Sequence, residues 1–302
     1  PLCVKCPDGI YNFWTLEDTD KLVQKIGNAK SAVVVGGGFV GLELAVSFAE
    51  RKLKTTYLIR EPYFWPAALD QASGEMIQKV LVDNGIHIYT NEEVADAEGN
   101  GKLEAVLTKS GKKIPADILG VGIGTIPNIE LAKDAGIKTN RGIVANEYME
   151  TNLPDVWAAG DAAEFYDVIA KKNSLLGNWA FSREQGKIAG LGMAGKKTIF
   201  KMVPCNSLSF FKCYIGFIGN TQASPETQVI TRDLREKQGG YIRIFINDGR
   251  ISGASILNCL PACMPLTKLV QAEARIDEIR DRLADPETDL AKLSAEILQA
   301  KN

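Results

Sequence analysis

The sequence has a single histidine among 302 residues, and this scarcity narrows the chemistry open to it. His87 lies between Ile86 and Ile88 in a short alternating pattern, which indicates a polar position on a strand. Catalytic relays of the Ser–His–Asp type need a histidine that accepts and returns a proton. We therefore interpret His87 as structural and expect no histidine-based relay.

The sequence also lacks a long apolar run and a strong net charge. A helix that crosses a bilayer needs about 20 apolar residues in a row, and no run approaches this length. The net charge is −2, so no basic surface for nucleic acid is expected. We expect no membrane span, no nucleic-acid partner and a cytoplasmic location.

Six cysteines are present, but their spacing completes no zinc site. Cys3 and Cys6 have the C-x-x-C spacing of redox and metal sites, and Cys259 and Cys263 form a second close pair. Neither pair is joined by a second C-x-x-C or a histidine, so four zinc ligands are lacking. Two interpretations stay open: reduced cytosolic thiols, or a cluster or redox pair.

The clearest local signal lies at 31–50, SAVVVGGGFVGLELAVSFAE. Its apolar opening predicts a buried parallel strand, and apolar residues recur at helical spacing from Leu42 onward. Between them, Gly36, Gly38 and Gly41 form the G-x-G-x-x-G pattern of a dinucleotide-binding turn. In that pattern the glycines permit the tight turn, the approach of a pyrophosphate and close packing of the helix, whose N-terminus faces the phosphates. A purely structural turn is the alternative.

A second parallel strand is predicted at 55–60 and ends in the charged pair Arg60-Glu61. An acidic residue at this point holds the ribose hydroxyls of NAD, whereas an arginine favours the 2′-phosphate of NADP. Both chemistries stand side by side, so the choice stays open, with a slight preference for NADH because of Glu61. A solvated strand end is the alternative.

Weaker patterns fill the rest of the first half. Thr15 is a candidate N-cap for a helix that ends near Gly27, with Asp18 completing a capping box. A small antiparallel meander is predicted at 93–114, and a buried strand that ends in glycines at 116–124. Further helices are expected at 76–82 and 178–195, and a further strand at 86–89.

A second informative stretch lies at 141–161. An apolar strand is predicted at 156–159, so that Gly160 and Asp161 follow its carboxyl end. Ligands of open α/β sheets bind at such ends. The Asp161 carboxylate could accept hydrogen bonds from the hydroxyls of a polyol chain.

The last third changes character. Five strands and a hairpin turn at 247–249 predict a β-rich domain, and the residues from 266 onward have a helical pattern with a restart near Pro286. This helical tail could pack on its own domain or on a partner chain. The predicted strands are 208–211, 214–218, 228–231, 241–246 and 251–257.

Three segments, taken in order, resemble the FAD-dependent pyridine-nucleotide-disulfide oxidoreductase superfamily, most of all its ferredoxin/rubredoxin reductase, nitrite-reductase-type and NADH oxidase branch. They are VVVGGGFVGLELA, ADILGVGIGTIPNIELAKDAGI and RGIVANEYMETNLPDVWAAGDAAEF. The resemblance covers roughly residues 10–260. It implies an α/β fold with a Rossmann-like NAD(P)-binding domain, a partial FAD-binding domain and an α+β C-terminal interface domain with a helical tail. The implied boundaries are 1–120, 121–195, 196–260 and 261–302.

The resemblance also implies which residues hold the two cofactors, and it implies no catalytic side chain and no metal ligand. The residues that it assigns to NAD(P)H are Gly36, Gly37, Gly38, Phe39, Val40, Gly41, Glu43, Arg60, Glu61, Gly122 and Gly124. The residues that it assigns to FAD are Gly160, Asp161, Asn178, Trp179 and Ala180.

One departure from the family matters for function. Family members begin with their own strand–GxGxxG–helix unit, which binds the ADP half of FAD, and this sequence starts about where that unit would end. A second such unit does not occur in it. We therefore expect the missing half of the FAD site to come from a further segment or from another chain, in a homo-oligomer or a heteromer.

The implied activity is transfer of hydride from NAD(P)H to FAD and onward to a redox protein such as rubredoxin or ferredoxin, to dioxygen or to a small acceptor. The absence of a histidine from the C-terminal region argues against the glutathione-reductase type, which carries a His–Glu proton donor there. The alternative is a noncatalytic subunit that binds a nucleotide within a larger redox complex.

Overall fold

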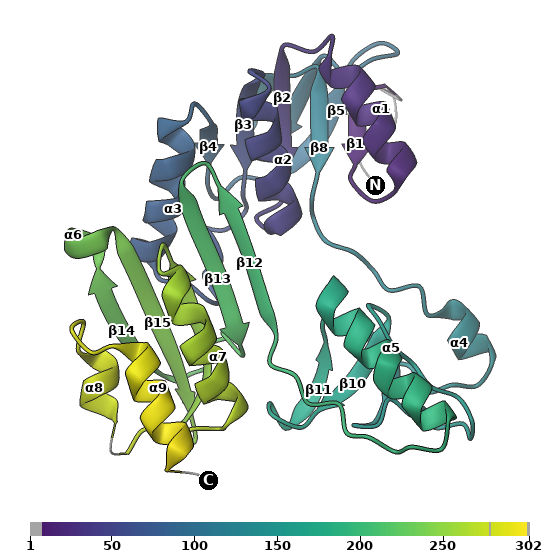
Figure 1. The fold of residues 1–302 in the computed structure, drawn as a ribbon. Coiled ribbons are helices and arrows are strands. Elements are labelled where there is room, and N and C mark those ends of the chain that lie inside the picture. The colour runs from purple at the N-terminus through teal and green to yellow at the C-terminus, as the bar shows by residue number, and fades with distance from the viewer. Residues whose placement is uncertain (1–7, 278, 301–302) are drawn as a thin grey trace. The chain divides into compact units, whose positions relative to one another are not determined.

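We describe residues 8–277 and 279–300 of a computed structural model of the chain (Figure 1). The chain divides into two compact units. Unit 1 comprises the residues up to Gly124 together with Leu208–Tyr214, and unit 2 comprises Thr125–Ser207 and the residues from Ile215 onward. Each unit is described by itself below.

Unit 1 is built on a five-stranded sheet whose strand order is β1-β8-β2-β3-β4. All four pairings are parallel. The order reverses direction beside β2, which has β3 on one side and β8 on the other, and ligands of open α/β sheets bind at such a switch point. This arrangement confirms the expected Rossmann-like fold. The strands are β1 (Ile10–Asn12), β2 (Ser31–Val35), β3 (Lys54–Leu58), β4 (His87–Tyr89) and β8 (Ile118–Val121).

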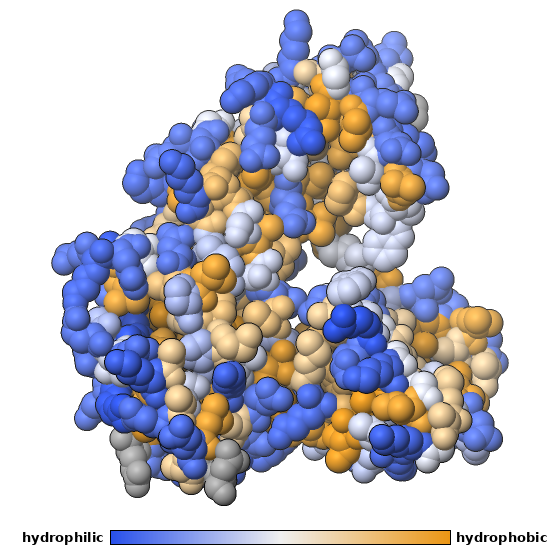
Figure 2. Space-filling view, viewed as in Figure 1, coloured by the Kyte–Doolittle hydropathy of each residue, from blue (hydrophilic) through white to orange (hydrophobic). Residues whose placement is uncertain are grey.

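Three helices accompany this sheet: α1 (Leu16–Ile26), α2 (Phe39–Glu50) and α3 (Gln71–Asp83). Thr15 and Asp18 form the predicted capping box of α1, with bonds of 3.1 and 3.0 Å between side chains and backbone N–H groups. A second capping box, between Asp70 and Ser73, starts α3 five residues before the predicted position. The outer face of α3 is hydrophilic, as Figure 2 shows, while Ile77 and Leu81 are buried.

An antiparallel meander of three strands completes unit 1, as predicted. The strands are β5 (Val94–Glu98), β6 (Ala105–Thr108) and β7 (Lys113–Pro115). Ala97 and Val106 of the meander share one apolar cluster with Val33, Leu58 and Leu119 of the parallel sheet. Burial of these side chains attaches the meander to the sheet that carries the glycine motif.

The first part of unit 2 holds a three-stranded sheet of order β11-β10-β9 and the helices α4 (Glu130–Asp134) and α5 (Trp179–Met193). Its strands are β9 (Ile143–Ala145), β10 (Ala163–Asp167) and β11 (Lys172–Leu175). Phe165, Phe181 and Phe200 form the centre of its core, with ring centroids 5.1–6.2 Å apart. These rings fasten α5 to β10.

The strand predicted at 156–159 is wrong. Trp157 makes only an isolated bridge with Glu150, because the chain folds back on itself here. The backbone N–H of Ala158 donates to the carbonyl of Met149 at 3.0 Å, and that of Thr151 donates to Val156 at 2.9 Å. The strand begins only at Ala163, so that Gly160 and Asp161 precede a strand instead of following one.

The residues from Cys205 to Leu257 contain an antiparallel sheet of order β12-β13-β16-β15-β14. Its strand bounds agree closely with the predicted ones. Its strands are β12 (Cys205–Phe210), β13 (Cys213–Gly219), β14 (Gln228–Leu234), β15 (Gly240–Asn247) and β16 (Arg250–Leu257). The remaining elements are α6 (Arg235–Gln238), η1 (Leu260–Ala262), α7 (Cys263–Gln271), α8 (Arg280–Ala284) and α9 (Leu290–Gln299).

The helical tail packs on its own sheet. Arg232 of β14 is only 3% exposed, and its guanidinium donates to one carbonyl of α8 and to two carbonyls of the segment between α8 and α9. The acceptors are Leu283 at 3.2 Å, Pro286 at 3.2 Å and Thr288 at 2.7 Å. Hydrogen bonds from a charged donor are the stronger kind, so Arg232 holds the tail in place. Within 8–277 and 279–300, no helix combines the length and apolar character of a bilayer crossing.

Candidate functional site

Three glycines fix the turn at the switch point of the parallel sheet. A Cβ on Gly36 would lie 2.2 Å from the carbonyl oxygen of Gly122, and a Cβ on Gly41 would lie 1.9 Å from the carbonyl oxygen of Gly36. A Cβ on Gly122 would lie 2.6 Å from the nitrogen of Gly41. The end of β2, the start of α2 and the end of β8 therefore touch through backbone atoms, which only glycine permits.

Gly38 differs from these three glycines because it faces open space. Among the described residues, no atom lies within 4 Å of a Cβ built on it. Gly38 is the N-cap of α2, and no side chain of the described residues caps this helix, whereas capping boxes close α1 and α3. The positive end of α2 thus opens beside a position without a side chain, and helix ends of this kind favour anions such as phosphate groups. Phe39 and Val40 form the first turn of α2.

Tyr57 of β3 stabilises the glycine turn through a hydrogen bond to its backbone. Its side chain is fully buried in β3, and its hydroxyl donates a hydrogen bond of 2.8 Å to the carbonyl of Gly36. Burial, together with the negative charge of Glu61, raises the pKa of Tyr57 far above its usual value, so the phenol stays a donor. The sequence pattern did not single out Tyr57, because its partner lies 21 residues away.

The structure brings Glu61 to the glycine turn. The carboxylate oxygen Oε2 of Glu61 lies 3.1 Å from the position of a Cβ on Gly37. Its other oxygen accepts a hydrogen bond of 2.7 Å from Nε of Arg60, whose side chain is 74% exposed. The predicted ribose pair therefore lies next to the predicted phosphate turn, with the carboxylate on the inner side.

Three residues are predicted near the nicotinamide end: Glu43 belongs to α2, and Gly122 and Gly124 follow β8. Glu43 is exposed just after the first turn of α2, and desolvation by the surrounding protein raises the pKa of its carboxyl. Gly124 follows β8 with φ of 100°, and none of the described residues has an atom within 4 Å of its Cβ position. Gly122 serves the backbone packing described above, so the open glycine of this pair is Gly124.

Asp161 lies beside the start of α5, in unit 2. Its Oδ1 accepts a hydrogen bond of 2.8 Å from the hydroxyl of Ser182, and a Cβ on Gly177 would come within 3.0 Å of the carboxylate. The preceding Gly160 has φ of 89° and donates its N–H to Oε1 of the fully buried Gln185 at 2.8 Å. The Asp161 carboxylate therefore lies beside the start of a helix, but the strand predicted before it is absent.

Asn178 is the N-cap of α5. Its Oδ1 accepts the backbone N–H of Phe181 at 2.9 Å, and its Nδ2 donates to Asn206 at 2.9 Å. Both polar atoms of the side chain are thus used within the protein. The next residue, Trp179, is 77% exposed and stacks with Arg183, whose guanidinium lies 5.2 Å from the ring centroid. Ala180 is half-buried in the same turn.

Gln185 is a second residue that the sequence pattern missed. Its side chain is fully buried, and its Nε2 finds no hydrogen-bond acceptor within the described part of the chain. Its partner Gly160 lies 25 residues earlier, so no local motif points to the pair. Gln185 shapes the loop that presents Asp161.

The cysteines form no metal site in the described ranges. Cys205, Cys213, Cys259 and Cys263 are not joined in disulfides, and no group of three or more His, Cys, Asp or Glu residues there could hold a metal ion. Burial raises the pKa of Cys213 to about 11, which makes it a poor nucleophile at neutral pH. The predicted pair Cys3 and Cys6 lies outside the described residues.

The sequence is similar to those of known proteins. Nitrite reductase (NAD(P)H) of Bacillus subtilis (strain 168) is 28% identical over 272 residues, which are 89% of this chain and 33% of that protein. NADH oxidase of Methanocaldococcus jannaschii is 31% identical over 274 residues, which are 85% of this chain and 61% of that protein. The chain thus spans less than two thirds of the length of these relatives.

Solved structures show the same fold. The ferredoxin reductase for the CYP199A2 system from Rhodopseudomonas palustris superimposes with a TM-score of 0.85 at 21% identity, over 94% of this chain and 69% of that one. The family described as pyridine nucleotide-disulphide oxidoreductase matches residues 5–186 of the sequence, which is more than half of the chain. The chain therefore belongs to the pyridine nucleotide-disulphide oxidoreductase family.

Proposed function

We propose that this chain is the nicotinamide-binding and flavin-contacting part of an NADH-dependent FAD oxidoreductase. Members of its family use FAD and NAD(P)H. The observation that carries the proposal is the open Gly38 at the uncapped start of α2, with the Glu61 carboxylate beside it at Gly37. We assign the dinucleotide to unit 1 and the flavin to the part of unit 2 that holds Asp161.

NADH fits this geometry better than NADPH. The carboxylate of Glu61 lies against the glycine turn, where it can accept hydrogen bonds from the two ribose hydroxyls. A 2′-phosphate at the same place would meet this negative charge. Arg60 offsets this charge only in part, because it pairs with Glu61 through Nε and its side chain is 74% exposed.

The residues of the chain bind and orient, and they transfer no proton. A bound nicotinamide would supply the hydride and a bound flavin ring would take it up. Gly38 and the start of α2 would hold the pyrophosphate, Glu61 would hold the ribose, and Asp161 would accept hydrogen bonds from the hydroxyls of the flavin side chain. A reaction of this kind needs no general base, which agrees with a chain that has one histidine.

The acceptor belongs to the finer part of the proposal. The two curated relatives described above are named for nitrite and for oxidase activity, and both names give a reduced nicotinamide as the electron donor. We propose a redox protein of the ferredoxin or rubredoxin class as acceptor. Dioxygen or a small oxidant would be an outcome of the test.

Anaerobic titration of the purified protein, with any chains that copurify, tests the proposal. Added or retained FAD should lose its absorbance near 450 nm on addition of NADH, roughly the change expected for a two-electron reduction, and NADPH should act more weakly. Native mass spectrometry of the same sample identifies bound cofactors and partner chains. Binding of NADH without any flavin reduction would instead favour a noncatalytic subunit, and a lack of NADH binding would overturn the proposal.

A further inference from the structure

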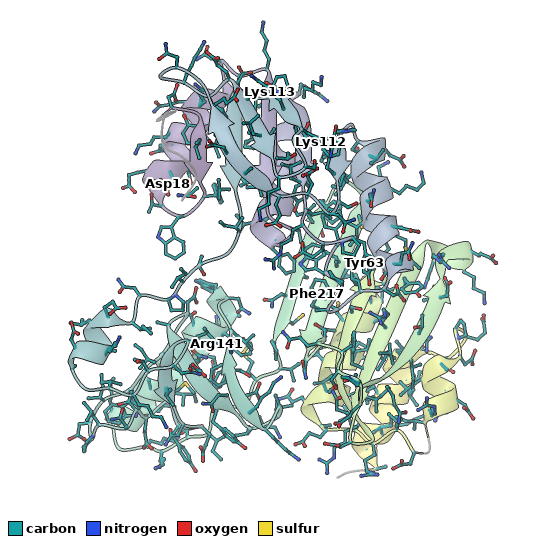
Figure 3. All side chains as sticks on the ribbon, turned by 180° about the vertical axis from the view of Figure 1, so that it is seen from behind. Asp18, Tyr63, Lys112, Lys113, Arg141 and Phe217 are labelled. Carbon is teal, nitrogen blue, oxygen red and sulfur yellow. The ribbon has the colours of Figure 1, made fainter. Side chains whose placement is uncertain are left out.

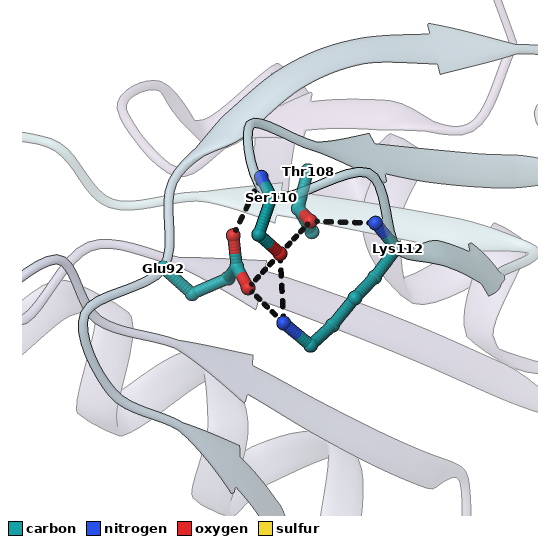
Figure 4. A network of polar contacts seen from close by, with 4 residues as sticks. All are labelled: Glu92, Thr108, Ser110 and Lys112. Atoms are coloured by element: carbon teal, nitrogen blue, oxygen red, sulfur yellow. Dashed lines mark hydrogen bonds and ion pairs between the residues drawn. The ribbon is translucent and has the colours of Figure 1, made fainter.

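A buried carboxylate lies in the loop that pairs with the segment carrying Arg60 and Glu61. It is not among the residues predicted to bind a cofactor. Glu92, in the loop between β4 and β5, is only 3% exposed. Its carboxylate accepts hydrogen bonds from the hydroxyl of Ser110 at 2.6 Å, the backbone N–H of Ser110 at 3.3 Å and Nζ of Lys112 at 2.6 Å (Figure 4). Ser110 and Lys112 belong to the turn that joins β6 to β7.

Thr108 completes the network and closes that turn. Its hydroxyl accepts the backbone N–H of Lys112 at 3.1 Å and lies 3.1 Å from the hydroxyl of Ser110. Lys112 also donates to Ser110 at 2.7 Å. Figure 3 shows Lys112 and Lys113 in the part of unit 1 that carries the meander, and Lys113 makes a separate ion pair with Glu98. The hydrogen bonds from Lys112 and Ser110 hold the pKa of Glu92 at about 2, so it is charged at neutral pH.

The backbone of the same loop forms hydrogen bonds with the residues that follow β3. The N–H of Glu92 donates to the carbonyl of Ile59 at 3.0 Å, and the N–H of Asn91 donates to the carbonyl of Glu61 at 3.1 Å. In return, the N–H of Ile59 donates to Tyr89 at 3.0 Å. The side chain of Glu92 therefore holds the meander turn, while its backbone holds the segment that carries Arg60 and Glu61.

We propose that Glu92 is a positioning residue for the adenosine half of the dinucleotide. It does not touch the cofactor. It links the meander turn to the Ile59–Glu61 segment, and so keeps the Glu61 carboxylate against the glycine turn. This inference rests on the proposed binding of NADH in unit 1.

The neighbouring residue provides a matched control. Glu93 makes an ion pair of 2.8 Å with Lys109, and both side chains are at least half exposed. Exposed pairs of this kind contribute little to stability. The substitution Glu93→Gln therefore removes one carboxylate charge from the same loop without touching the buried network.

The test compares Glu92→Gln with Glu93→Gln in the binding of three ligands, NADH, ADP-ribose and reduced nicotinamide mononucleotide, with thermal unfolding measured in parallel. We expect Glu92→Gln to weaken NADH and ADP-ribose by about tenfold and to leave the mononucleotide within about twofold, because only the first two contain the adenosine half. Glu93→Gln should change none of the three affinities.

Unchanged NADH affinity in a folded Glu92→Gln variant would overturn the inference, as would an equal loss for the mononucleotide. If Glu92→Gln does not fold, Ser110→Ala replaces it, since this variant keeps the ion pair between Glu92 and Lys112 and removes the contacts of the Ser110 hydroxyl with Glu92, Thr108 and Lys112. The same selective loss, about threefold, is then expected, and its absence contradicts the inference. A wild-type protein that binds none of the ligands would instead contradict the proposed function.

Discussion

The hydroxyl of Tyr57 donates a hydrogen bond of 2.8 Å to the carbonyl of Gly36, so a fully buried side chain of β3 holds the turn that ends β2. The two strands run parallel and side by side. The bond links β3 to the turn at which the dinucleotide is proposed to bind. The shape of this turn thus depends on a residue outside the glycine motif.

The substitution Tyr57→Phe should weaken NADH binding while keeping the fold. It removes the donor but leaves the ring, so the Gly36 carbonyl loses its partner and unfolding becomes easier by about 1–2 kcal/mol. We expect a lower unfolding temperature and a loss of NADH affinity of a few fold, measured by calorimetry. Wild-type affinity in this variant would show that the turn keeps its shape without the bond.

Gly38→Val and Gly41→Ala should separate binding from folding. A Cβ at position 38 would stand in open space at the N-cap, so we expect Gly38→Val to change stability by no more than about 1 kcal/mol but to lose NADH affinity by about tenfold or more. A Cβ at position 41 would lie 1.9 Å from the Gly36 carbonyl oxygen, so Gly41→Ala should cost more than about 3 kcal/mol. Denaturant unfolding and NADH titration check both, and equal behaviour of the two variants would contradict the assignment.

Asp161→Ala should lower the retention of flavin without unfolding unit 2. The carboxylate is exposed, and its described hydrogen bond comes from the Ser182 hydroxyl, so little folding energy depends on it. We expect about tenfold weaker FAD binding, measured by fluorescence during dialysis. Glu184→Gln, on the helix that carries Ser182 and paired with Lys187, is the matched control and should retain flavin normally. Equal retention by both variants would remove Asp161 from the flavin site.

The stability of unit 1 should decrease as the pH is lowered, over a range set by the pKa of Glu92. Its carboxyl has a pKa of about 2 in the folded state against an ordinary value of 4.5, so its contribution is full above pH 4.5 and is lost as the pH falls toward 2. We expect this contribution to be about 2 kcal/mol, since Lys112 is partly exposed. Thermal unfolding curves of the wild type and Glu92→Gln should therefore differ at pH 7 and converge toward pH 2, whereas Glu93→Gln should follow the wild type. Parallel curves for all three would contradict this origin of the acid sensitivity.

The parts of the fold that depend on short-range patterns could be predicted from the sequence. The capping box of Thr15 and Asp18 and the strand–glycine–helix unit are both confirmed, because each joins residues only a few positions apart. Helix α3 began earlier than predicted, since Ser73 acts as the third residue of a capping box, a place where Glu or Gln is the usual signal.

The parts that depend on distant partners could not be predicted. Val156–Ala159 has the apolar composition of a strand, yet its backbone pairs with Met149 and Thr151 in a tight reversal. Glu92 and Ser110 are 18 residues apart, and Tyr57 and Gly36 are 21 apart, so only the folded chain brings them together. Of the candidate site, the glycines and the charged pair were therefore visible in the sequence, and the side chains that support them were not.

The closest contacts among Gly36, Gly41 and Gly122 are made by backbone atoms. A clash between two side chains can be relieved by a smaller residue at the second position. Here the second position is already glycine, so no smaller residue exists. Second-site suppressors of a substitution at any of the three should therefore be rare in a genetic screen. Gly38 has no such backbone contact, so side chains at this position of the motif should be tolerated by the fold and be selected against only where ligand binding is required.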